Sequence, residues 1–500
     1  MSDQVLVLIT LSIYLGFMLG IGIWAARVRT GNMVDFFLGG RKLNSLVVAL
    51  SAVVSGRSSW LILGVSGAAY LKGISAAWVL PGYIIMELFL FLTIGKRLRY
   101  YTQSADNITI PDFFESRYRD QSGLLRIVAV SIIVFFFTLY ISAQLSAGQR
   151  AFKMIFDFQD VLPGMIIITF FVVIYTILGG FTAVVLTDVI QAFFMLLSLV
   201  ALPIYVIFMK GGPGELYSFL ASFGSPDINM LAFGSLISIV NGLSIGFGSV
   251  GNPHILVRYM SIEKPRKLSK AALIGTFWNV IMGWGAIFIG LLARMEYPAL
   301  QQLFDADREC AFLSLAQDYF HPILFGFAVS ALIAAIMSTV DSQLLVVSSG
   351  IARDIYQKII RRKDTVAEDK MILISRITIF VVMMIAFFLG IFVSKHKADW
   401  PIFTYVLLAW SGLGAAFGPA LILSLYWKRT TGWGVLSGFI GGLAATLIWK
   451  GLCNKTLHWQ LAEYLPGFVF ATLCIIIVSL ITTVPDGALA EFEKAKRREK

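Results

Sequence analysis

Residues 45–72 read SLVVALSAVVSGRSSWLILGVSGAAYLK, an apolar stretch that is long enough to cross a membrane and is interrupted by SGRSS at 55–59. A second apolar stretch, residues 233–259, is interrupted by GFGSVGNP at 246–253. Unwound backbone within a bilayer is tolerated only where it is buried in protein or lines a cavity. Either break alone would fit a proline kink or close glycine packing. Two breaks at matching places, five spans apart, instead indicate an inverted-repeat transporter with its binding site at the breaks.

The composition places most of the chain in lipid. Hydrophobic residues make up 58% of the 500 positions and charged residues 14%, against about 25% charged residues in soluble domains. The net charge of +11 does not form a basic domain with interleaved aromatic residues, so we expect no nucleic-acid partner. The first apolar run, residues 5–26, is too long for a signal-peptide core and has no basic residues before it, which predicts an uncleaved first helix.

The apolar runs predict about thirteen membrane-spanning helices. Their expected limits are 4–26, 45–72, 74–95, 124–152, 162–183, 185–209, 233–259, 270–293, 322–352, 371–394, 402–426, 432–451 and 465–483. Lys and Arg gather in the loops of one side and in the tail at 494–500, where we expect contact with anionic membrane lipid. The positive-inside rule therefore predicts a multi-pass protein of a bacterial-type plasma (inner) membrane, with the N-terminus outside and the C-terminus cytoplasmic.

A few charged residues lie deep within the expected spans. Arg57 falls at the first break, and Glu87 falls in the third span. Asp188 lies at the inner start of the sixth span, and Asp341 lies in the ninth. A charged residue at the centre of a membrane helix costs about 2.5–3.5 kcal/mol, so each of these residues requires a function or a partner.

The ninth span carries a row of hydroxyl groups. Ala335, Ser338, Thr339 and Ser342 share one helical face by their three-and-four spacing. Two adjacent hydroxyls beside the free carbonyls of a broken helix form an all-oxygen site, which suits a small hard cation. The alternative is that these hydroxyls only bond to carbonyls four residues earlier in their own helix. The pattern alone leaves both interpretations open.

Short motifs extend over nearly the whole chain. They are FLGGR at 37–41, ALSA at 49–52, IPDFF at 110–114, GGFTAV at 179–184, TD at 187–188 with Gln191, NPHIL at 252–256, AAIMST at 334–339 and GLGAAFGP at 412–419. Together they resemble the solute:sodium symporter family, and most closely its bacterial sodium/proline branch. The IPDFF motif also predicts a short interfacial helix in an inner loop.

The resemblance implies an all-α membrane protein with a leucine-transporter-type core, in which spans 2–6 and 7–11 form two inverted repeats. The chain then divides into a first transmembrane helix and inner loop (1–43), a ten-helix transporter core with two broken helices (44–430), and two C-terminal helices with a basic cytoplasmic tail (431–500). The implied activity is sodium symport of L-proline or a related small amino or organic acid by alternating access. No enzyme activity is implied, and no cofactor other than sodium as the coupling ion.

The same resemblance assigns candidate site residues. It places the coupling cation at the carbonyls of Val54, Arg57 and Ala335 and the hydroxyls of Ser338 and Thr339, with Asp188 taking part in sodium handling. It places the solute between the two broken helices. The candidate solute-binding residues are Ser58, Trp60, Tyr140, Ile245, Ser249 and Asn252.

The chain departs from the family pattern at the site. Proline carriers of the family have Asp-Met where this chain has Gly56-Arg57, and Trp and Tyr where it has Ile245 and Ser249. They have a small hydroxyl residue at the position of Asp341. These changes leave the identity of the solute open.

Arg57 has three interpretations. Its permanent charge could replace that of sodium, neutralised by Asp341 or Glu87, which would make the protein a sodium-independent or proton-linked carrier. It could instead bind a substrate carboxylate through two hydrogen bonds. It could also form a buried ion pair that only locks helices together. The most specific expectation is a pair between Arg57 and Asp341, on the two elements that frame the cation site.

Two other classes of protein fit less well. A membrane enzyme would need a catalytic cluster, and the four histidines are dispersed. A membrane solute sensor would carry a signalling domain, and about 17 residues follow the last expected span. Cys310 and Cys453 both fall in expected outer loops, but their spacing alone cannot place them together as a disulfide.

Overall fold

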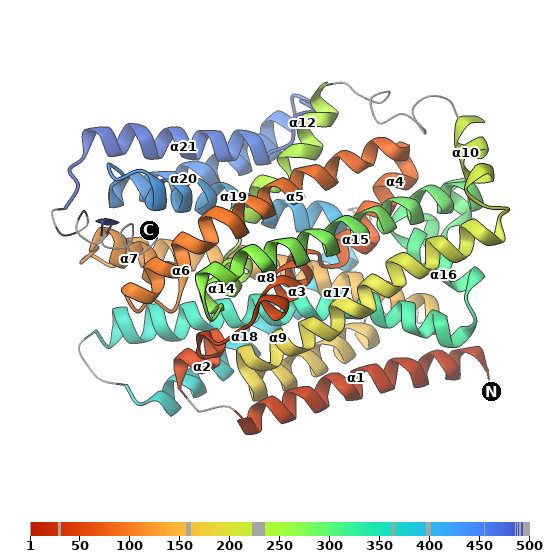
Figure 1. The fold of residues 1–500 in the computed structure, drawn as a ribbon, viewed down its shortest axis with the longest axis horizontal. Helices are drawn as coiled ribbons and strands as arrows, with labels where there is room; N and C mark the ends of the chain where they lie inside the picture. Colours follow the sequence, from red (N-terminus) through yellow and green to blue (C-terminus); the bar gives the residue numbers. More distant parts are fainter. Residues whose placement is uncertain are drawn as a thin grey trace.

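The computed structural model describes residues 2–28, 32–156, 162–222, 236–362, 366–396, 402–454 and 456–485, together with 487, 489, 492 and 493. These residues form a bundle of helices, most of which run along the longest axis of the molecule (Figure 1). The first helix begins at one end of this axis and the last named helix ends at the other. Within the described ranges, the β-pairing is limited to one isolated parallel bridge between Leu43 and Ile262.

The helices keep the order of the expected spans. In the first half they are α1 (Asp3–Val28), α2 (Met33–Leu38), α3 (Ser45–Gly56), α4 (Ser66–Lys72), α5 (Val79–Phe89), α6 (Gly95–Ser104), α7 (Ile110–Tyr118), α8 (Leu124–Phe156), α9 (Leu162–Met209) and α10 (Pro213–Ser222). In the second half they are α12 (Leu236–Ser244), α13 (Gly246–Val250), α14 (Pro253–Ser261), α15 (Leu268–Glu296), α16 (Ala311–Tyr319), α17 (Pro322–Ser349), α18 (Glu368–His396), α19 (Ile402–Tyr426), α20 (Gly432–Ile448) and α21 (Tyr464–Ile481). Helix α7 is the short helix predicted from the IPDFF motif.

Ten helical stretches among the described residues are long and apolar enough to cross a membrane, and Ser45–Gly56 and Leu236–Val250 are shorter apolar helices. The sequence-based number of about thirteen is higher partly because single helical stretches contain two expected spans. Helix α9 has 48 residues, which at 1.5 Å per residue would extend about 72 Å, more than twice the hydrocarbon core of a bilayer. Gly180 interrupts it with φ 59° and ψ −149°, a left-handed conformation that favours glycine.

Both expected broken helices are present. Asn44 caps the start of α3 by accepting a hydrogen bond from the amide of Val47, and α3 ends at Gly56. A π-helical segment, Trp60–Val65, then leads into α4. The second broken helix consists of α12, α13 and α14. The bridge between Leu43 and Ile262 joins the chain just before α3 to the chain just after α14, so the two broken helices are tied together at one end of the bundle.

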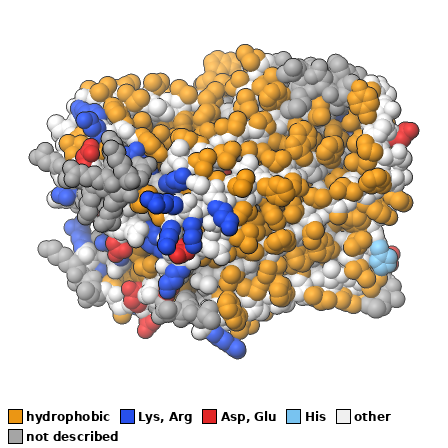
Figure 2. All heavy atoms as spheres, viewed as in Figure 1, with side chains coloured by type: hydrophobic (Ala, Val, Ile, Leu, Met, Phe, Trp, Pro, Cys, Tyr) orange, Lys and Arg blue, Asp and Glu red, His pale blue; other side chains and the backbone are white. Residues whose placement is uncertain are grey.

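The outer surface matches a lipid environment. Figure 2 shows hydrophobic side chains covering most of one face, whereas Lys and Arg gather toward the end of the molecule where α2, α6 and α14 lie in Figure 1. Large apolar side chains such as Leu273 and Phe388 are exposed on the surface of the bundle, as expected for contact with lipid. Cys310, Cys453 and Cys474 are free thiols, so the structure does not contain the disulfide considered for Cys310 and Cys453.

Candidate functional site

The first break is held open by side chains that satisfy its backbone. The Gly56 carbonyl, at the end of α3, accepts hydrogen bonds from the indole Nε1 of Trp60 at 3.0 Å and from Nη1 of Arg57 at 3.2 Å. The amide of Ser59 donates to the side-chain oxygen of Gln144 on α8 at 3.3 Å. Because unpaired backbone groups are costly in a bilayer, these contacts explain how the chain remains unwound at mid-helix.

The second break is set by glycine and proline. Helix α13 ends at Val250 with Gly251 as its C-cap, Asn252 is extended with φ −89° and ψ 106°, and Pro253 occupies the first turn of α14. The side-chain amide of Asn252 donates to the Gly248 carbonyl at 2.6 Å. A Cβ atom on Gly248 would lie 1.9 Å from the indole nitrogen of Trp410. Glycine is therefore required at this position for α13 to approach α19.

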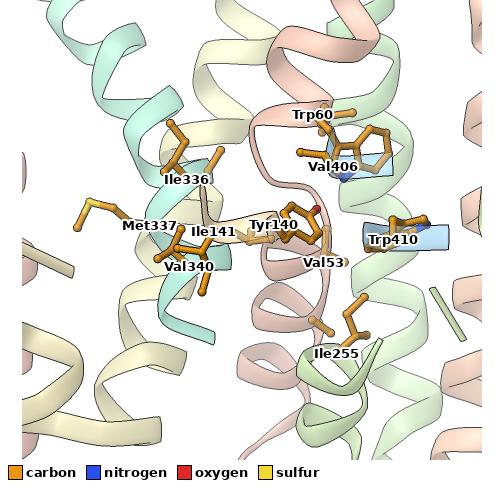
Figure 3. Close-up of a cluster of buried hydrophobic side chains, with 14 of the residues drawn as sticks. Val53, Trp60, Tyr140, Ile141, Ile255, Ile336, Met337, Val340, Val406 and Trp410 are labelled. Carbon is orange, nitrogen blue, oxygen red and sulfur yellow. The ribbon is translucent and has the colours of Figure 1, made fainter. Parts of the chain in front are cut away.

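Aromatic side chains gather around the first break. Trp60 lies near Trp410, with ring centroids 6.3 Å apart, and the hydroxyls of Ser58 and Tyr140 are 3.2 Å apart. In Figure 3, Tyr140 lies between the two tryptophans on one side and the side chains of α17 on the other. The Trp410 indole also donates to the carbonyl of Ile245 at 2.9 Å, which connects the aromatic group to the second broken helix.

All six candidate solute-binding residues are buried: Ser58, Trp60, Tyr140, Ile245, Ser249 and Asn252. The structure brings Ser58 to Tyr140, and it brings Trp60 and Ile245 to Trp410. Three side-chain oxygens at the breaks have no hydrogen-bond partner among the described residues, namely Ser59 Oγ, Ser249 Oγ and Asn252 Oδ1. An unpaired buried polar atom costs about 1–3 kcal/mol, so a polar ligand bound here would recover part of that energy.

The candidate cation ligands come from α3 and α17. The Thr339 hydroxyl donates to the Ser55 carbonyl at 3.0 Å, which brings α17 directly against the end of α3. The Ala335 carbonyl accepts from Ser338 Oγ at 3.1 Å and lies 3.3 Å from Thr339 Oγ1. Thr339 thus makes the bond to the carbonyl four residues earlier that was the alternative, whereas Ser338 bonds to the carbonyl three residues earlier. Through the Thr339–Ser55 bond, these oxygens also belong to a group shared by two elements. An all-oxygen donor set fits a hard monovalent or divalent cation.

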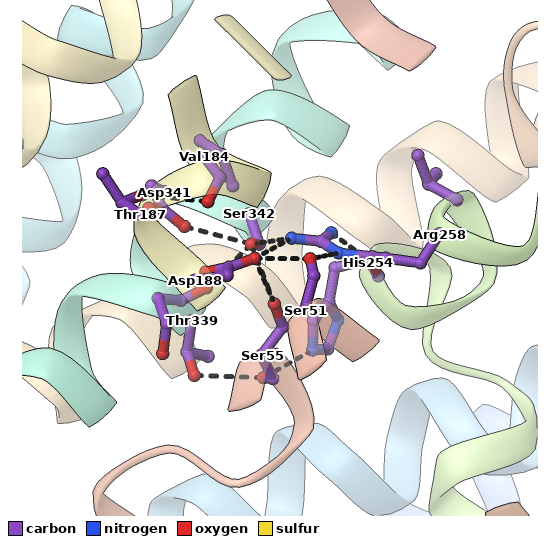
Figure 4. Close-up of polar contacts among 12 residues, drawn as sticks. Ser51, Ser55, Val184, Thr187, Asp188, His254, Arg258, Thr339, Asp341 and Ser342 are labelled. Carbon is purple, nitrogen blue, oxygen red and sulfur yellow. Dashed lines mark hydrogen bonds and ion pairs between the residues drawn. The ribbon is translucent and has the colours of Figure 1, made fainter. Parts of the chain in front are cut away.

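Asp188 belongs to a buried polar network close to these oxygens (Figure 4). Its Oδ2 atom accepts from Ser51 at 2.6 Å and from Ser55 at 3.3 Å, both on α3. It also pairs with Nη2 of Arg258 on α14 at 3.2 Å. The Asp188 Oδ1 atom has no hydrogen-bond partner in the described part of the chain. This network joins both broken helices to α9.

Asp341 lies in the same network and not beside Arg57. Its Oδ2 atom accepts from the Tyr175 hydroxyl at 2.5 Å, and its Oδ1 atom accepts from Ser342 at 3.0 Å. Ser342 in turn accepts a hydrogen bond from Arg258. The expectation that Arg57 pairs with Asp341 is therefore wrong. Asp341 faces α9, whereas the side chain of Arg57 extends toward α5 and α15.

Arg57 forms a buried ion pair with Glu87 on α5. Its Nε atom donates to the side-chain oxygen of Asn279 on α15 at 2.9 Å, and the Asn279 amide donates to Glu87 at 2.5 Å. The guanidinium carbon lies 3.9 Å from the ring centroid of Tyr83. All of these partners are on α5 and α15, so the Arg57 side chain is directed away from the candidate cation ligands of α17.

The comparison with protein families agrees with this arrangement. The model of the sodium:solute symporter family matches residues 36–442, which include both broken helices and α17.

The chain belongs to the sodium:solute symporter family.

Known members similar to this symporter include proline carriers. It is 39% identical to the osmoregulated proline transporter OpuE of Bacillus subtilis, with 99% of each chain covered. It is 35% identical to a sodium/proline symporter of Staphylococcus aureus, with 98% of this chain and 95% of that protein covered. These matches extend over nearly the full length and support the expected resemblance.

The fold of the symporter is also found in a solved structure. A Na⁺-coupled sialic acid symporter in a substrate-bound, outward-open state superposes with a TM-score of 0.80 and 17% identity, covering 96% of this chain and 98% of the other. This likeness confirms the predicted leucine-transporter-type architecture and the all-helical membrane class.

Sequence reasoning missed several residues of the site of this symporter. Gln144, Arg258 and Asn279 are polar side chains within apolar helices, which was a usable signal for each of them. Tyr175 and Trp410 offered no such signal, because aromatic residues are common in membrane helices. Their roles depend on which face of the helix meets the break.

Proposed function

We propose that this sodium-coupled solute symporter imports L-proline or a closely related small amino or organic acid by alternating access. The observation that carries the proposal is the contact between the Thr339 hydroxyl and the Ser55 carbonyl. It brings the candidate cation ligands of α17 against the unwound segment whose next residues, Ser58 and Trp60, face the candidate solute site. Its proline-transporting relatives support the choice of solute.

The position of Arg57 favours sodium coupling over the alternative in which its charge replaces that of sodium. Glu87 already neutralises the guanidinium, and Asn279 binds it from α15. A cation at the oxygens of Ser338 and Thr339 would therefore bring a positive charge that Arg57 does not supply there. The paired guanidinium also gives less support to the interpretation in which Arg57 binds a substrate carboxylate.

The cation and the solute are coupled through α3. The oxygens of Ser338 and Thr339 can ligate the ion through their lone pairs while their protons stay bonded to the carbonyls of Ala335 and Ser55, so an ion bound to Thr339 acts on α3 through the Thr339–Ser55 hydrogen bond. This hydrogen bond acts on the same unwound segment that presents Ser59 Oγ to the solute. Sodium binding thereby prepares the solute site, and a bound solute prepares the cation site by the same free energy.

The polar network of Asp188 borders a small cavity through Arg258 and Ser342, and Phe37 and Ser349 also line this cavity. Asp188 itself has one oxygen without a hydrogen-bond partner among the described residues. A free carboxylate oxygen close to Ser55 and Ser342 is suited to attract the cation, and Asp188 is therefore assigned a part in sodium handling.

The solute is tested by uptake into proteoliposomes. The purified protein should accumulate labelled L-proline when an inward sodium gradient is imposed, and an equal potassium gradient should serve as the control. Unlabelled amino acids and organic acids should compete, whereas sugars should not. Equal uptake in the two gradients would contradict sodium coupling. Transport of one of the competing acids in place of L-proline would reassign the solute, and an absence of any uptake would favour a solute sensor.

A further inference from the structure

The Arg57 cluster, defined here as Arg57, Glu87, Asn279 and Tyr83, lies beside the candidate solute site. Among the described residues, the hydrogen bonds and the ion pair of this cluster do not extend to α17. Its side chains come from three separate elements: the break after α3, helix α5 and helix α15. Arg57 is fully buried and Glu87 is almost so. Burying such charged groups within a membrane costs free energy, so a function for the cluster is expected.

The cluster acts on the unwound backbone. Arg57 Nη1 donates a hydrogen bond to the Gly56 carbonyl oxygen, and the same oxygen accepts a hydrogen bond from the indole Nε1 of Trp60. The position of the guanidinium therefore helps to fix this carbonyl and the orientation of the indole that it binds.

The cluster also acts on Trp60 through ring contacts. The Tyr83 ring packs edge-on against Trp60 with centroids 5.8 Å apart, while Arg57 lies over Tyr83 at 3.9 Å and near Trp60 at 5.7 Å. The guanidinium therefore packs on the Tyr83 ring, and this ring packs against the Trp60 indole. A shift of Arg57 would change the support of Trp60 through Tyr83.

Two residues hold Arg57 in this position. Glu87 supplies the negative charge that pairs with the guanidinium. The side chain of Asn279 accepts a hydrogen bond from Arg57 Nε through its oxygen and donates one to Glu87 through its nitrogen. We infer that Glu87 and Asn279 are positioning residues for solute binding: through Arg57 they fix the Gly56 carbonyl and the Trp60 indole. This inference rests on the proposed function. It assigns the cluster to recognition of the solute and leaves cation binding to the oxygens of α3 and α17.

The main test variant is Asn279→Leu, which removes both hydrogen bonds of the amide at similar volume. In proteoliposomes we expect the KM for labelled L-proline to rise about tenfold, the factor that corresponds to about 1.4 kcal/mol. At a saturating concentration of L-proline, the sodium concentration for half-maximal uptake should change less than twofold, because the coupling to bound solute is then fully present. In detergent, the rise in Tm caused by L-proline should be lost, and the rise caused by sodium should remain.

A paired variant guards against simple loss of folding. Arg57→Met together with Glu87→Met removes both buried charges at once, so no uncompensated charge remains. It should fold, respond to sodium as the wild type does, and show the same rise in KM for L-proline. Asn279→Gln, which keeps an amide, should restore part of the affinity.

The outcomes separate the inference from the proposed function. Uptake by the wild type in the same liposomes tests the function, and only a transported solute is used to test the variants. If the folded paired variant and Asn279→Leu both keep the wild-type KM, the cluster is only structural and the inference is overturned. A parallel loss of the sodium and solute responses would overturn it as well, because the cluster would then not be specific to the solute.

Discussion

At the scale of single residues, Ser338 and Thr339 are expected to govern the response to sodium. Replacing either with Ala removes one oxygen ligand, and the sodium concentration for half-maximal uptake should rise roughly tenfold, the change that about 1.4 kcal/mol produces. Ser330→Ala is a matched control, because Ser330 lies on the same helix and its hydroxyl makes a similar local bond to the Gly326 carbonyl at 2.8 Å. An unchanged sodium response in the Ser338→Ala, Thr339→Ala double variant would argue against a cation site there.

The partners of Arg57 give a second prediction at this scale. Removing one member of a buried ion pair costs about 3–5 kcal/mol, because the other charge is left uncompensated. The double variant Arg57→Met, Glu87→Gln should therefore have a smaller decrease in Tm in detergent than the sum of the decreases in the two single variants. Arg57→Met and Asp341→Ser should add, since the two residues share no contact. A strong coupling between Arg57 and Asp341 would contradict the structure.

The error about Arg57 has a physical origin. The sequence places Arg57 at the break and Asp341 on the facing helix, and both placements are correct. The direction of a long side chain depends on the rotation of the unwound segment, for which no periodic pattern exists. The sequence offers Glu87 as a second partner for Arg57, but it does not single out Asn279, because amides in membrane helices have many uses.

At the scale of elements, the interfacial helix α7 is tied to its neighbours by ion pairs. Asp112 pairs with Arg126 at the start of α8 at 2.8 Å and with Arg353 after α17 at 3.3 Å. Burial alone would raise the pKa of Asp112, but the two guanidinium groups outweigh it and hold this pKa below its usual value. Because the pKa is lower in the folded state, the ionised carboxylate stabilises the fold at neutral pH.

This stabilisation should be lost in acid. It is fully present above the ordinary Asp pKa of about 3.9 and disappears as the pH falls through the lowered value. Between about pH 6 and about pH 3, the Tm of the wild type should therefore fall further than that of Asp112→Asn. Asp3→Asn, near the start of α1, provides a control outside the network. Parallel curves for the wild type and Asp112→Asn would show that the ion pairs add no stability.

At the scale of the whole molecule, the orientation in the membrane follows from the distribution of charge. Lys and Arg gather at the end of the bundle opposite to the start of α1 (Figure 2), so we expect this end to be cytoplasmic. In a variant without native cysteines, Lys264→Cys should react with a membrane-impermeant maleimide only in inside-out vesicles. Ser2→Cys should react in intact cells. The opposite labelling pattern would reverse the proposed topology.

Most of the architecture could be predicted because hydrophobic length and helix breaks are properties of the sequence itself. The two interruptions at 55–59 and 246–253 correctly indicated the two broken helices. The sequence also predicts that residues 162–209 form two spans, and in the structure the interruption between them lies at Gly180. The pairing of α3 with α14 through Leu43 and Ile262 had no sequence signal, because backbone hydrogen bonds do not depend on the identity of the side chain.

That bridge has an evolutionary consequence. The amide of Leu43 donates to the Ser261 carbonyl at 3.2 Å, and the amide of Glu263 donates to the Leu43 carbonyl at 2.9 Å. Any residue except proline can supply these amides at positions 43 and 263. The side chain of Leu43 also packs against the core, whereas that of Glu263 is exposed. Mutations can therefore accumulate at position 263 while the link between the two broken helices persists, and a search for invariant side chains would pass over this end of the contact.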